Sequence, residues 1–359
     1  MNKLTITSLF AGAGGLDLGF ERAGFRTIWA NEFDGHIWQT YEENFSETTL
    51  DKRSITDIPV NEIPDADGII GGPPCQSWSN AGKGRGLKDK RGQLFRTYIE
   101  IIKVKQPKFF LCENVAGIVS TRHIDSFIEF LRDFESAGYA VSWKLIDANS
   151  YDVPQSRKRV IIVGYRKDLG KQFQFPDPQG KYPTLRDAIG DLAEAIPAKE
   201  HNHPNEALEM PNHEYFVGKF SSRYMQANRV RSWDEPSYTI VATANSAPIH
   251  PKVPKMVKVA KQDFIFDPKY EAECRRLSIR ECARVQTFPD DFVFRYKNLV
   301  HGYKMVGNAV PVRLAEIIAK QIYDDLSSVK SDSALSRMIE ANEGDTICLP
   351  DNNNTGRKE

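Results

Sequence analysis

Short apolar runs alternate with helical patterns along the first half of the chain. Six runs rich in aliphatic and β-branched residues are bounded by polar residues or glycines, as the strands of a buried sheet are. These runs occupy residues 4–9, 27–30, 68–71, 109–113, 141–147 and 160–165. Helical periodicity occurs between them, at residues 16–23, 37–44, 94–105 and 124–137. The alternation predicts an α/β fold with a mostly parallel sheet, right-handed crossovers and helices on both faces.

The hydrophobic pattern changes after residue 165. Residues 173–298 are rich in Pro, His and Asn, with one clear helical pattern at residues 279–285. The α/β character returns at residues 302–310 and in a helical run at 312–326, which we expect to pack on the first domain. We therefore expect a first domain of residues 1–172 and 299–326, a smaller irregular domain of residues 173–298, and a disordered polar tail over residues 327–359.

The composition is that of an ordinary globular protein large enough for about two domains. Of the 359 residues, 40% are hydrophobic and 27% are charged, which allows a sizeable core. No apolar stretch is long enough to span a membrane, and the first residues lack the apolar region of a signal peptide. The five cysteines are odd in number and never spaced as C-x-x-C. We expect a cytoplasmic protein without membrane contact, a disulfide framework or a metal site.

Basic residues are clustered although the chain is neutral overall, with 48 Lys and Arg against 48 Asp and Glu. Residues 80–108 contain nine Lys and Arg and two acids. The other basic groups are residues 157–159, then Arg223, Arg229 and Arg231, then Arg275, Arg276, Arg280 and Arg284. Local positive surfaces on a neutral protein suit binding to phosphates, although each cluster alone is equally typical of solvated surface charge.

A glycine-rich turn follows the first predicted strand. Its sequence is Phe10-Ala11-Gly12-Ala13-Gly14-Gly15, and glycines let the backbone turn sharply and approach a cofactor closely. Glu32 lies twenty residues after Gly12 at the end of the next strand, where an acid accepts hydrogen bonds from ribose hydroxyls. The pair indicates a nucleoside cofactor. Because the glycines do not follow G-x-G-x-x-G, the residues alone leave S-adenosylmethionine and a dinucleotide both open.

A cysteine follows the third predicted strand in a stiff loop, Gly71-Gly72-Pro73-Pro74-Cys75. Ligands of open α/β sheets bind at the carboxyl ends of the strands. Cys75 would therefore be exposed but rigidly held, as a nucleophile must be, and the basic residues after it would favour its thiolate. Cys112 lies within a predicted strand and is interpreted as a small buried residue.

Charged residues at two further strand ends belong to the same predicted edge. Glu113 ends the next strand, and Arg157 and Arg159 directly precede the last one. The sequence therefore brings a thiol, a carboxylate and guanidinium groups together at one edge of the sheet.

Taken in order, these segments resemble the motifs of the DNA cytosine-5 methyltransferase family. The matching segments are residues 10–15, Asn31-Glu32, 72–76, 113–115, 155–159, 280–286 and 302–311, so the resemblance covers about residues 4–325. The first half is most similar to prokaryotic restriction-modification enzymes of the HaeIII type, which act on GGCC. The resemblance implies the Rossmann-like fold of S-adenosylmethionine-dependent methyltransferases, with the irregular region as a target-recognition domain.

The resemblance also implies a reaction: methylation of carbon 5 of a cytosine in double-stranded DNA. Cys75 would attack carbon 6 of the base while Glu113 protonates or hydrogen-bonds N3. Arg159 would hold O2, and Arg157 would bind the neighbouring phosphate. A stacked base cannot be reached, so the cytosine must be flipped out of the duplex. No metal is required.

Two sets of binding residues are implied by the same resemblance. The cofactor residues are Phe10, Ala11, Gly12, Gly14, Gly15, Glu32, Phe33, Ile55, Pro73, Leu94, Asn308 and Ala309, and Phe33 would stack on the adenine. The DNA-binding residues are Lys83, Arg85, Lys90, Arg91, Arg229 and Arg231. The first four belong to a basic, glycine-rich loop over residues 79–93, which we expect to be a mobile lid. Arginines suit guanine edges, so the last two favour a GC-containing target.

Two segments depart from the family pattern. Ser54 stands where the family has an aspartate that binds the adenine amino group, so Ser54 or Asp57 would have to replace it. Residues 241–248 differ from the GGCC-type pattern and contain no arginine, so the target sequence is not readable.

Two alternative functions stay open: the same chemistry on tRNA, and a nucleic-acid-binding pseudoenzyme. A tRNA target does not require a recognition domain of this size, and a pseudoenzyme does not require Cys75, Glu113 and Arg159 together. Both are therefore less favoured than DNA methylation. We expect a monomer, acting with or without a cognate restriction endonuclease.

Overall fold

The computed structural model describes residues 3–74, 90–205 and 207–343. In this part of the chain the central sheet has seven strands in the order β3-β2-β1-β4-β5-β7-β6. The strands are β1 (Thr5–Leu9), β2 (Arg26–Asn31), β3 (Thr49–Asp51), β4 (Gly68–Gly71), β5 (Phe109–Val115), β6 (Tyr139–Asp147) and β7 (Lys158–Arg166). Strand β7 pairs antiparallel with both β5 and β6, and the other four described pairs of this sheet are parallel. The predicted mostly parallel α/β sheet is confirmed, and only the short edge strand β3 was not expected.

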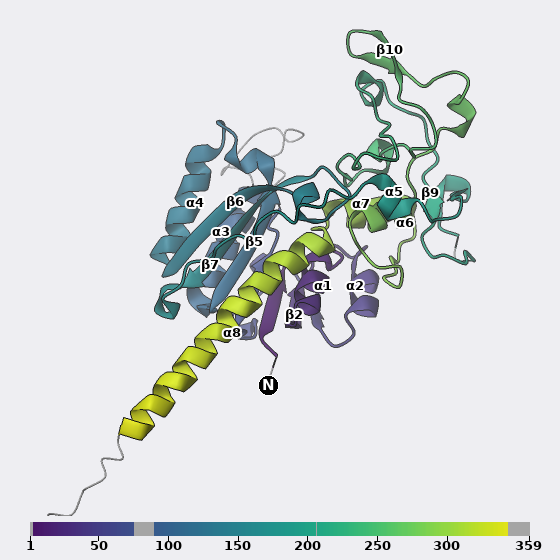
Figure 1. Ribbon diagram of the computed structural model, residues 1–359. Helices are drawn as coiled ribbons and strands as arrows, with labels where there is room; N and C mark the ends of the chain where they lie inside the picture. Colours follow the sequence, from purple (N-terminus) through teal and green to yellow (C-terminus); the bar gives the residue numbers. More distant parts are fainter. Residues whose placement is uncertain (1–2, 75–89, 206, 344–359) are drawn as a thin grey trace, which may run out of the picture.

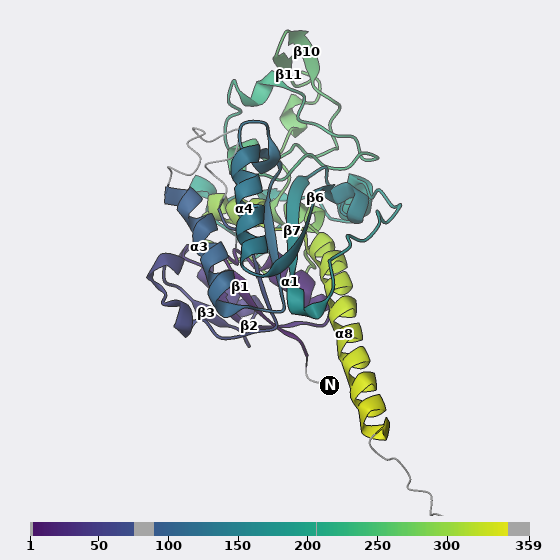
Figure 2. The same cartoon turned by 90° about the vertical axis from the view of Figure 1, so that its left-hand side faces the viewer.

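Helices cover both faces of the sheet (Figures 1 and 2). They are α1 (Gly15–Arg22), α2 (Trp38–Asn44), α3 (Lys90–Lys105), α4 (Ile124–Ser136) and α8 (Val312–Glu343). Successive residues of β5 point to opposite faces. Phe109 therefore packs in one hydrophobic cluster with α1 and α8, and Phe110 packs in another with α3 and α4.

Helix α8 is longer than its sequence predicts. Its apolar contacts with the sheet extend as far as Leu326, as expected for a helix that returns to the first domain, but the helix continues to Glu343. The expectation of disorder is therefore wrong for residues 327–343. These residues contain no glycine or proline, so nothing in the backbone interrupts the helix. In Figure 1 this part of α8 runs away from the rest of the described chain.

The second half of the chain is irregular, as expected. It contains α5 (Leu185–Ile189), α6 (Ile279–Val285) and α7 (Leu299–Asn308), with two two-stranded sheets formed by β8 (Ile196–Pro197) with β9 (Glu214–Tyr215) and by β10 (Val257–Ala260) with β11 (Asp263–Ile265). Helix α6 begins with a capping box, because the Ser278 hydroxyl accepts the Glu281 N–H at 3.0 Å and the Glu281 carboxylate accepts the Ser278 N–H at 2.7 Å.

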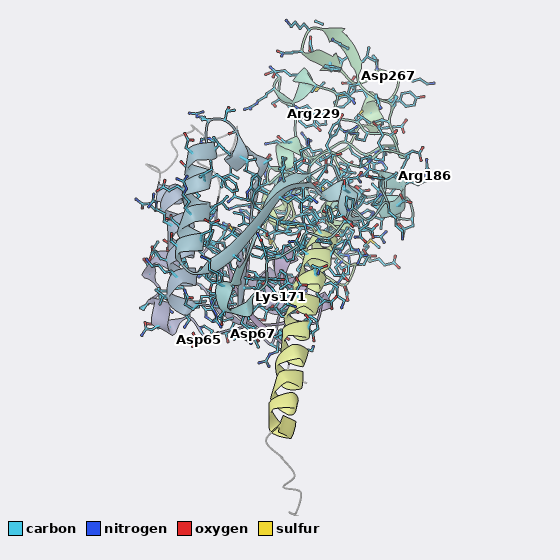
Figure 3. All side chains as sticks on the ribbon, turned by 60° about the vertical axis from the view of Figure 1, so that its left-hand side comes forward. Asp65, Asp67, Lys171, Arg186, Arg229 and Asp267 are labelled. Carbon is cyan, nitrogen blue, oxygen red and sulfur yellow. The ribbon has the colours of Figure 1, made fainter. Side chains whose placement is uncertain are left out.

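Two hydrophobic clusters organise this second half. An outer cluster of Tyr224, Val230, Ile249, Val253, Met256 and Phe266 supports the arm that carries β10 and β11, and Figure 3 shows Arg229 and Asp267 on that arm. An inner cluster joins α6 and α7 to Tyr41 of α2 and to Phe45, which directly follows that helix. The inner part of the irregular region therefore shares its core with the first domain. Among the described residues, no helix has the length and apolar composition needed to cross a membrane.

Candidate active site

Glu113 and Arg159 form an ion pair at the edge of the sheet where the parallel strands end. Strand β5 pairs with β7 so that Val115 lies opposite Arg159 and Glu113 lies opposite Ile161. The two charged side chains therefore project from the same face of neighbouring strands. Arg159 Nε lies 2.8 Å from Glu113 Oε1, and both side chains are largely buried. The carboxylate and one guanidinium expected at this edge therefore lie together there, because β7 runs antiparallel to β5.

The loop after β4 passes directly beside this carboxylate. A Cβ added to Gly72 would lie 3.4 Å from Glu113 Oε2, which is close contact. The carbonyl of Pro73 accepts a hydrogen bond from the side-chain amide of Asn114 at 3.2 Å. These contacts hold the loop at Gly72 and Pro73, and Cys75 itself lies outside the described residues.

Arg157 is not placed to bind a DNA phosphate, and this expectation is corrected by the structure. Its side chain is only 1% exposed. The guanidinium donates hydrogen bonds to three backbone carbonyls, those of Ile240 at 2.9 Å and of Gly307 and Ala309 at 3.0 Å. Burial lowers the pKa of this guanidinium, and the nearby Glu113 carboxylate opposes that shift. Arg157, two residues before Arg159, therefore binds backbone carbonyls in the protein interior.

The glycine-rich turn after β1 has a backbone that other residues would not adopt easily. Gly12 and Gly14 have φ angles of +58° and +85°, in the left-handed region that glycine tolerates. A Cβ on Gly14 would lie 2.2 Å from the ring of Phe45, and a Cβ on Gly15 would lie 2.5 Å from the carbonyl oxygen of Val310. Gly12 is therefore required by its conformation, Gly15 by lack of space for a side chain, and Gly14 by both.

Glu32 stands beside this turn. Its carboxylate accepts the N–H groups of Gly12 at 2.9 Å and Asp34 at 2.7 Å. Burial raises the pKa of Glu32, while these two hydrogen bonds act in the opposite direction. Phe33, the next residue, is 69% exposed. A fixed carboxylate next to an exposed aromatic ring fits an adenosine group, which presents a ribose diol and a flat base.

The other predicted cofactor residues lie near the same edge. Ala309 approaches the turn, since a Cβ on Gly15 would lie 3.2 Å from the Ala309 Cβ, and Asn308 is the exposed last residue of α7. Ile55 is buried in the cluster against which Leu94 packs. The Ser54 hydroxyl lies 2.8 Å from the Thr56 hydroxyl, which donates to Asp57, so both candidate replacements for the family aspartate belong to one hydrogen-bonded chain.

The predicted recognition arginines differ in their surroundings. Arg229 lines a pocket of about 260 Å³ with Tyr238, Thr239, Val241, Ser246 and Pro248. Its Nε donates to the Tyr224 carbonyl at 2.8 Å and its guanidinium lies over the Tyr224 ring. Arg231 forms an ion pair with Glu235 at 3.0 Å and lies over the Tyr238 ring. Lys83 and Arg85 lie outside the described residues, as do the side chains of Lys90 and Arg91 in the first turn of α3.

Comparison with known proteins agrees with this geometry. Residues 4–324 match the family model of C-5 cytosine-specific DNA methylases. The chain belongs to this family. It is 55% identical to the type II methyltransferase M.MthTI of Methanothermobacter thermautotrophicus, with 91% of this chain and 99% of that protein covered. It is 51% identical to M.FnuDI of Fusobacterium nucleatum, over 90% of this chain and 95% of that protein.

Solved structures show the same fold. A structure described as a DNA modification methyltransferase from an E. coli prophage is 25% identical, covers 90% of this chain and 99% of its own, and gives a TM-score of 0.69. DNMT2 of Spodoptera frugiperda is similar in fold alone, with a TM-score of 0.65 at 18% identity over 89% of this chain and 99% of its own. This protein is accordingly a DNA cytosine-5 methyltransferase.

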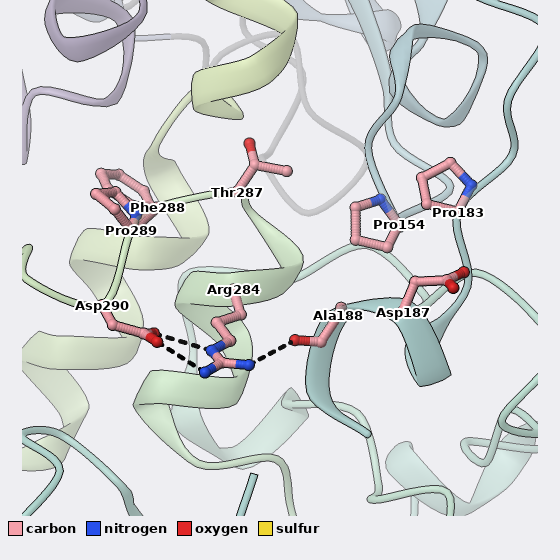
Figure 4. A pocket seen from close by; sticks show the side chains of 9 residues that line it. All are labelled: Pro154, Pro183, Asp187, Ala188, Arg284, Thr287, Phe288, Pro289 and Asp290. Carbon is pink, nitrogen blue, oxygen red and sulfur yellow. Dashed lines mark hydrogen bonds and ion pairs between the residues drawn. The ribbon is translucent and has the colours of Figure 1, made fainter. Parts of the chain in front are cut away.

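One basic cluster of this methyltransferase is not a nucleic-acid surface. Arg275 pairs with Glu281 and Glu194, and Arg276 and Arg280 donate to backbone carbonyls. Arg284 pairs with Asp290 at 2.7 Å and donates to the Ala188 carbonyl at the wall of a pocket of about 300 Å³ (Figure 4). All four guanidiniums therefore have acceptors within the protein, which the sequence pattern does not reveal.

Two contacts near the cofactor edge are not predicted by the sequence. Lys304 of α7 donates to the Asp34 carboxylate at 2.6 Å, and the rings of His36 and His301 stack with centroids 3.7 Å apart. Both contacts tie α7 to the loop that follows Glu32. The sequence hints at the first contact only through spacing. Asp34 lies two residues after Glu32, and Lys304 lies four residues before Asn308.

Proposed function

We propose that this methyltransferase moves a methyl group from S-adenosylmethionine to carbon 5 of a cytosine flipped out of double-stranded DNA, with Cys75 as covalent nucleophile. The observation that carries the proposal is the ion pair between Glu113 and Arg159 beside the Gly72-Pro73 loop. This pair offers a carboxylate and a guanidinium at the edge where the nucleophile's loop leaves the sheet.

The ion pair suits the hydrogen-bonding edge of cytosine. Glu113 would hydrogen-bond or protonate N3, and Arg159 would donate to O2. Arg159 NH1 already donates to the Lys158 carbonyl and its Nε faces Glu113, so the plane of the guanidinium is fixed before a base arrives. Preorganised donors of this kind stabilise charge that develops during reaction.

Cys75 supplies the covalent step. Addition of its thiolate to carbon 6, with the N3 edge held by Glu113, makes carbon 5 electron-rich enough to accept a methyl group. After methylation the carbon 5 proton is lost, the electron pair re-forms the ring double bond, and the thiolate leaves. S-adenosylmethionine, when bound, supplies the methyl group as a substituent of a positively charged sulfur.

The cofactor would lie across the ends of β1 and β2. Glu32 would accept the ribose hydroxyls, Phe33 would stack on the adenine, and Ile55 and Leu94 would form an apolar wall. The rest of the cofactor would be surrounded by the backbone of residues 10–15 and by Pro73, Asn308 and Ala309. No atom of the described residues lies within 4 Å of a Cβ added to Gly12. This free space supports a close approach of the cofactor to the backbone there.

The loop over residues 79–93 would close over the flipped base, with Lys83, Arg85, Lys90 and Arg91 on phosphates. Arg229 would read a guanine edge in the major groove. We further propose that residues 173–298 act as the target-recognition domain, that the enzyme works as a cytoplasmic monomer, and that it is the modification partner of a restriction endonuclease. Its similarity to M.MthTI and M.FnuDI, both named type II methyltransferases, supports the last point.

The mechanism is tested by trapping the covalent complex. The purified protein is incubated with labelled S-adenosylmethionine and duplex DNA in which 5-fluorocytosine replaces cytosine, because fluorine at carbon 5 prevents release of the thiolate. We expect an adduct that survives denaturation with wild type and with Cys112→Ser, which serves as a control because Cys112 is buried. The C75S variant should form none.

Glu113→Gln should form the adduct at least about tenfold more slowly, since a neutral amide cannot deliver a proton to N3. Wild-type labelling of C75S would overturn the assignment of the nucleophile. An adduct with tRNA but with no DNA duplex would replace DNA by RNA as the substrate. Bisulfite sequencing of a methylated plasmid identifies the target sequence.

A further inference from the structure

Three parts of the enzyme meet at one buried polar junction, which consists of the side chains of Gln155, Arg157 and Gln286 and the backbones of Ile240 and Ala309. All three side chains are at most 1% exposed. Gln155 Nε2 donates to Gln286 Oε1 at 2.8 Å. Gln286 Nε2 in turn donates to the carbonyls of Val306 and Ala309. Arg157 Nε is buried without a hydrogen-bond partner, whereas the other side-chain polar atoms of the junction are satisfied. A buried network satisfied to this extent is rigid.

The junction holds one residue of the recognition region from both sides. The N–H of Ile240 donates to Gln155 Oε1 at 2.9 Å, and the carbonyl of Ile240 accepts from Arg157 at 2.9 Å. Both backbone groups of this residue are therefore bound to side chains that come from the segment before β7. Three of its neighbours line the Arg229 pocket: Tyr238 and Thr239 before it and Val241 after it.

Backbone contacts extend this attachment along the chain. Ser237 donates to the Pro154 carbonyl and accepts from the Ser156 N–H, each at 2.9 Å. The Thr239 hydroxyl donates to the Ser156 carbonyl at 2.7 Å. Residues 237–240 therefore lie along residues 154–157, and the latter segment leads within two residues to Arg159.

The same junction reaches the end of α7. Arg157 donates to the carbonyls of Gly307 and Ala309, on either side of Asn308. A Cβ on Gly307 would lie 2.3 Å from the carbonyl carbon of Val241. The backbone at Val241 therefore packs directly on the backbone of α7. The wall of the Arg229 pocket thus contacts both the segment that leads to the ion pair and the end of α7.

We propose that Arg157, supported by Gln155 and Gln286, is a positioning residue that couples target recognition to catalysis. It fixes residues 237–241 relative to Arg159 and to Asn308, so that a DNA sequence which fits the Arg229 pocket aligns the cytosine site and the cofactor site together. This inference rests on the proposed roles of Arg159 and of the recognition region. Arg157 acts through these residues and touches neither base nor cofactor.

The chain offers a matched control for this role. Arg280 is also fully buried, and its guanidinium also donates to three backbone carbonyls, those of Pro211, Pro289 and Phe292. None of these contacts involves residues 154–159 or 237–241. Replacing either arginine by lysine removes the fork that reaches three acceptors, so both variants lose comparable interior hydrogen bonds. Only R157K removes the hydrogen bond that holds residues 237–241.

The test compares full-length wild type, R157K and R280K on one plasmid. Bisulfite sequencing at successive times gives the methylation rate of each cytosine context, normalised to the fraction of enzyme that forms the 5-fluorocytosine adduct. Thermal melting measures the stability of each variant. We expect both variants to melt at lower temperature. In R157K the ratio of the rate at the preferred context to the rates at contexts differing by one base should fall roughly tenfold, while R280K keeps the wild-type ratio.

Two further variants keep the test decisive if R157K does not fold. Q155M and Q286M each remove one part of the junction, and each should lower the same ratio. Their double variant should lower it by less than the product of the single effects, because the two side chains share one hydrogen bond. An unchanged ratio in these variants or in R157K, or an equal fall in R280K, would overturn the coupling role. A wild-type enzyme that methylates no duplex would overturn the proposed function itself.

Discussion

At the sheet edge, the orientation of each charged side chain depends on the groups in direct contact with it. Glu113 and Arg159 fix one another, and Gly72 keeps the neighbouring loop close to the carboxylate. The glycines at 12 and 14 have positive φ angles, so the turn that faces the cofactor site depends on their lack of a side chain. Beneath this turn lies an acidic residue that the proposed reaction does not use, Asp17.

Asp17 should make the stability of the enzyme pH-dependent. It is fully buried, its carboxylate accepts the Tyr41 hydroxyl at 2.8 Å, and burial raises the pKa of Asp17 to about 6. The pKa of Asp17 in the folded protein is above the unfolded value near 3.8. The stabilisation that the protonated acid gives to the folded state is therefore fully present below about pH 4 and is lost as the pH rises through 6. This difference between the folded and unfolded pKa of Asp17 corresponds to about 3 kcal/mol of unfolding free energy.

Asp17→Asn keeps the acceptor for Tyr41 and removes the titration. Relative to wild type, this variant should gain about 3 kcal/mol between pH 4 and pH 8, measured by urea unfolding at each pH. Asp57→Asn, at an exposed position, is the control and should follow wild type. Parallel pH profiles for wild type and Asp17→Asn would contradict the prediction.

Elements are positioned by local signals as well as by packing. Helix α6 is only seven residues long, so its first turn has few intrahelical hydrogen bonds to hold it. The Ser278–Glu281 capping box supplies partners for two of its free N–H groups. Glu281 also pairs with Arg275, which joins the start of α6 to the segment before it.

Ser278→Ala should destabilise the enzyme by about 1 kcal/mol, since one N-terminal N–H loses its acceptor. The effect is read as a lower midpoint in urea with an unchanged slope. Ser278→Thr, which retains the hydroxyl, should restore most of the loss. If alanine and threonine behave alike, the hydroxyl does not cap the helix.

At the scale of the whole molecule, one inner hydrophobic cluster joins the two halves. Phe45, which directly follows α2, lies against Gly14 and packs with Phe292, while α6 and α7 contribute to the same cluster. The first domain and the inner part of the irregular region therefore share buried apolar surface. Cooperative unfolding of both is the physical consequence.

Phe45→Ala should cost about 3–5 kcal/mol, as large-to-small core changes do. Hydrogen exchange should accelerate to a similar extent in α1 and in α6, although α6 is more than two hundred residues away in sequence. Phe266→Ala, in the outer cluster, should accelerate exchange mainly in the arm. Protection retained in α6 of Phe45→Ala would show that the two halves unfold separately.

Much of the site could be predicted because parallel strands end at a common edge. Glu32 and Glu113 come at the ends of apolar runs, so parallel strands bring them to that edge, and the motif order identifies the family. Arg159 precedes its apolar run and reaches the same edge because β7 runs antiparallel to β5. The end of helix α8 could not be predicted from hydrophobicity, because its apolar contacts with the sheet extend as far as Leu326 while the helix continues to Glu343.

The sequence by itself determined the α/β fold, the family and the identity of the residues at the sheet edge, since these depend on local periodicity and on short motifs. The tertiary structure alone decided which groups each arginine binds. Arg157 and Arg159 are two residues apart and alike in sequence, yet one binds backbone carbonyls of distant segments and the other pairs with Glu113. Acceptors for a guanidinium come from segments up to about 150 residues away, and only the folded chain brings them together.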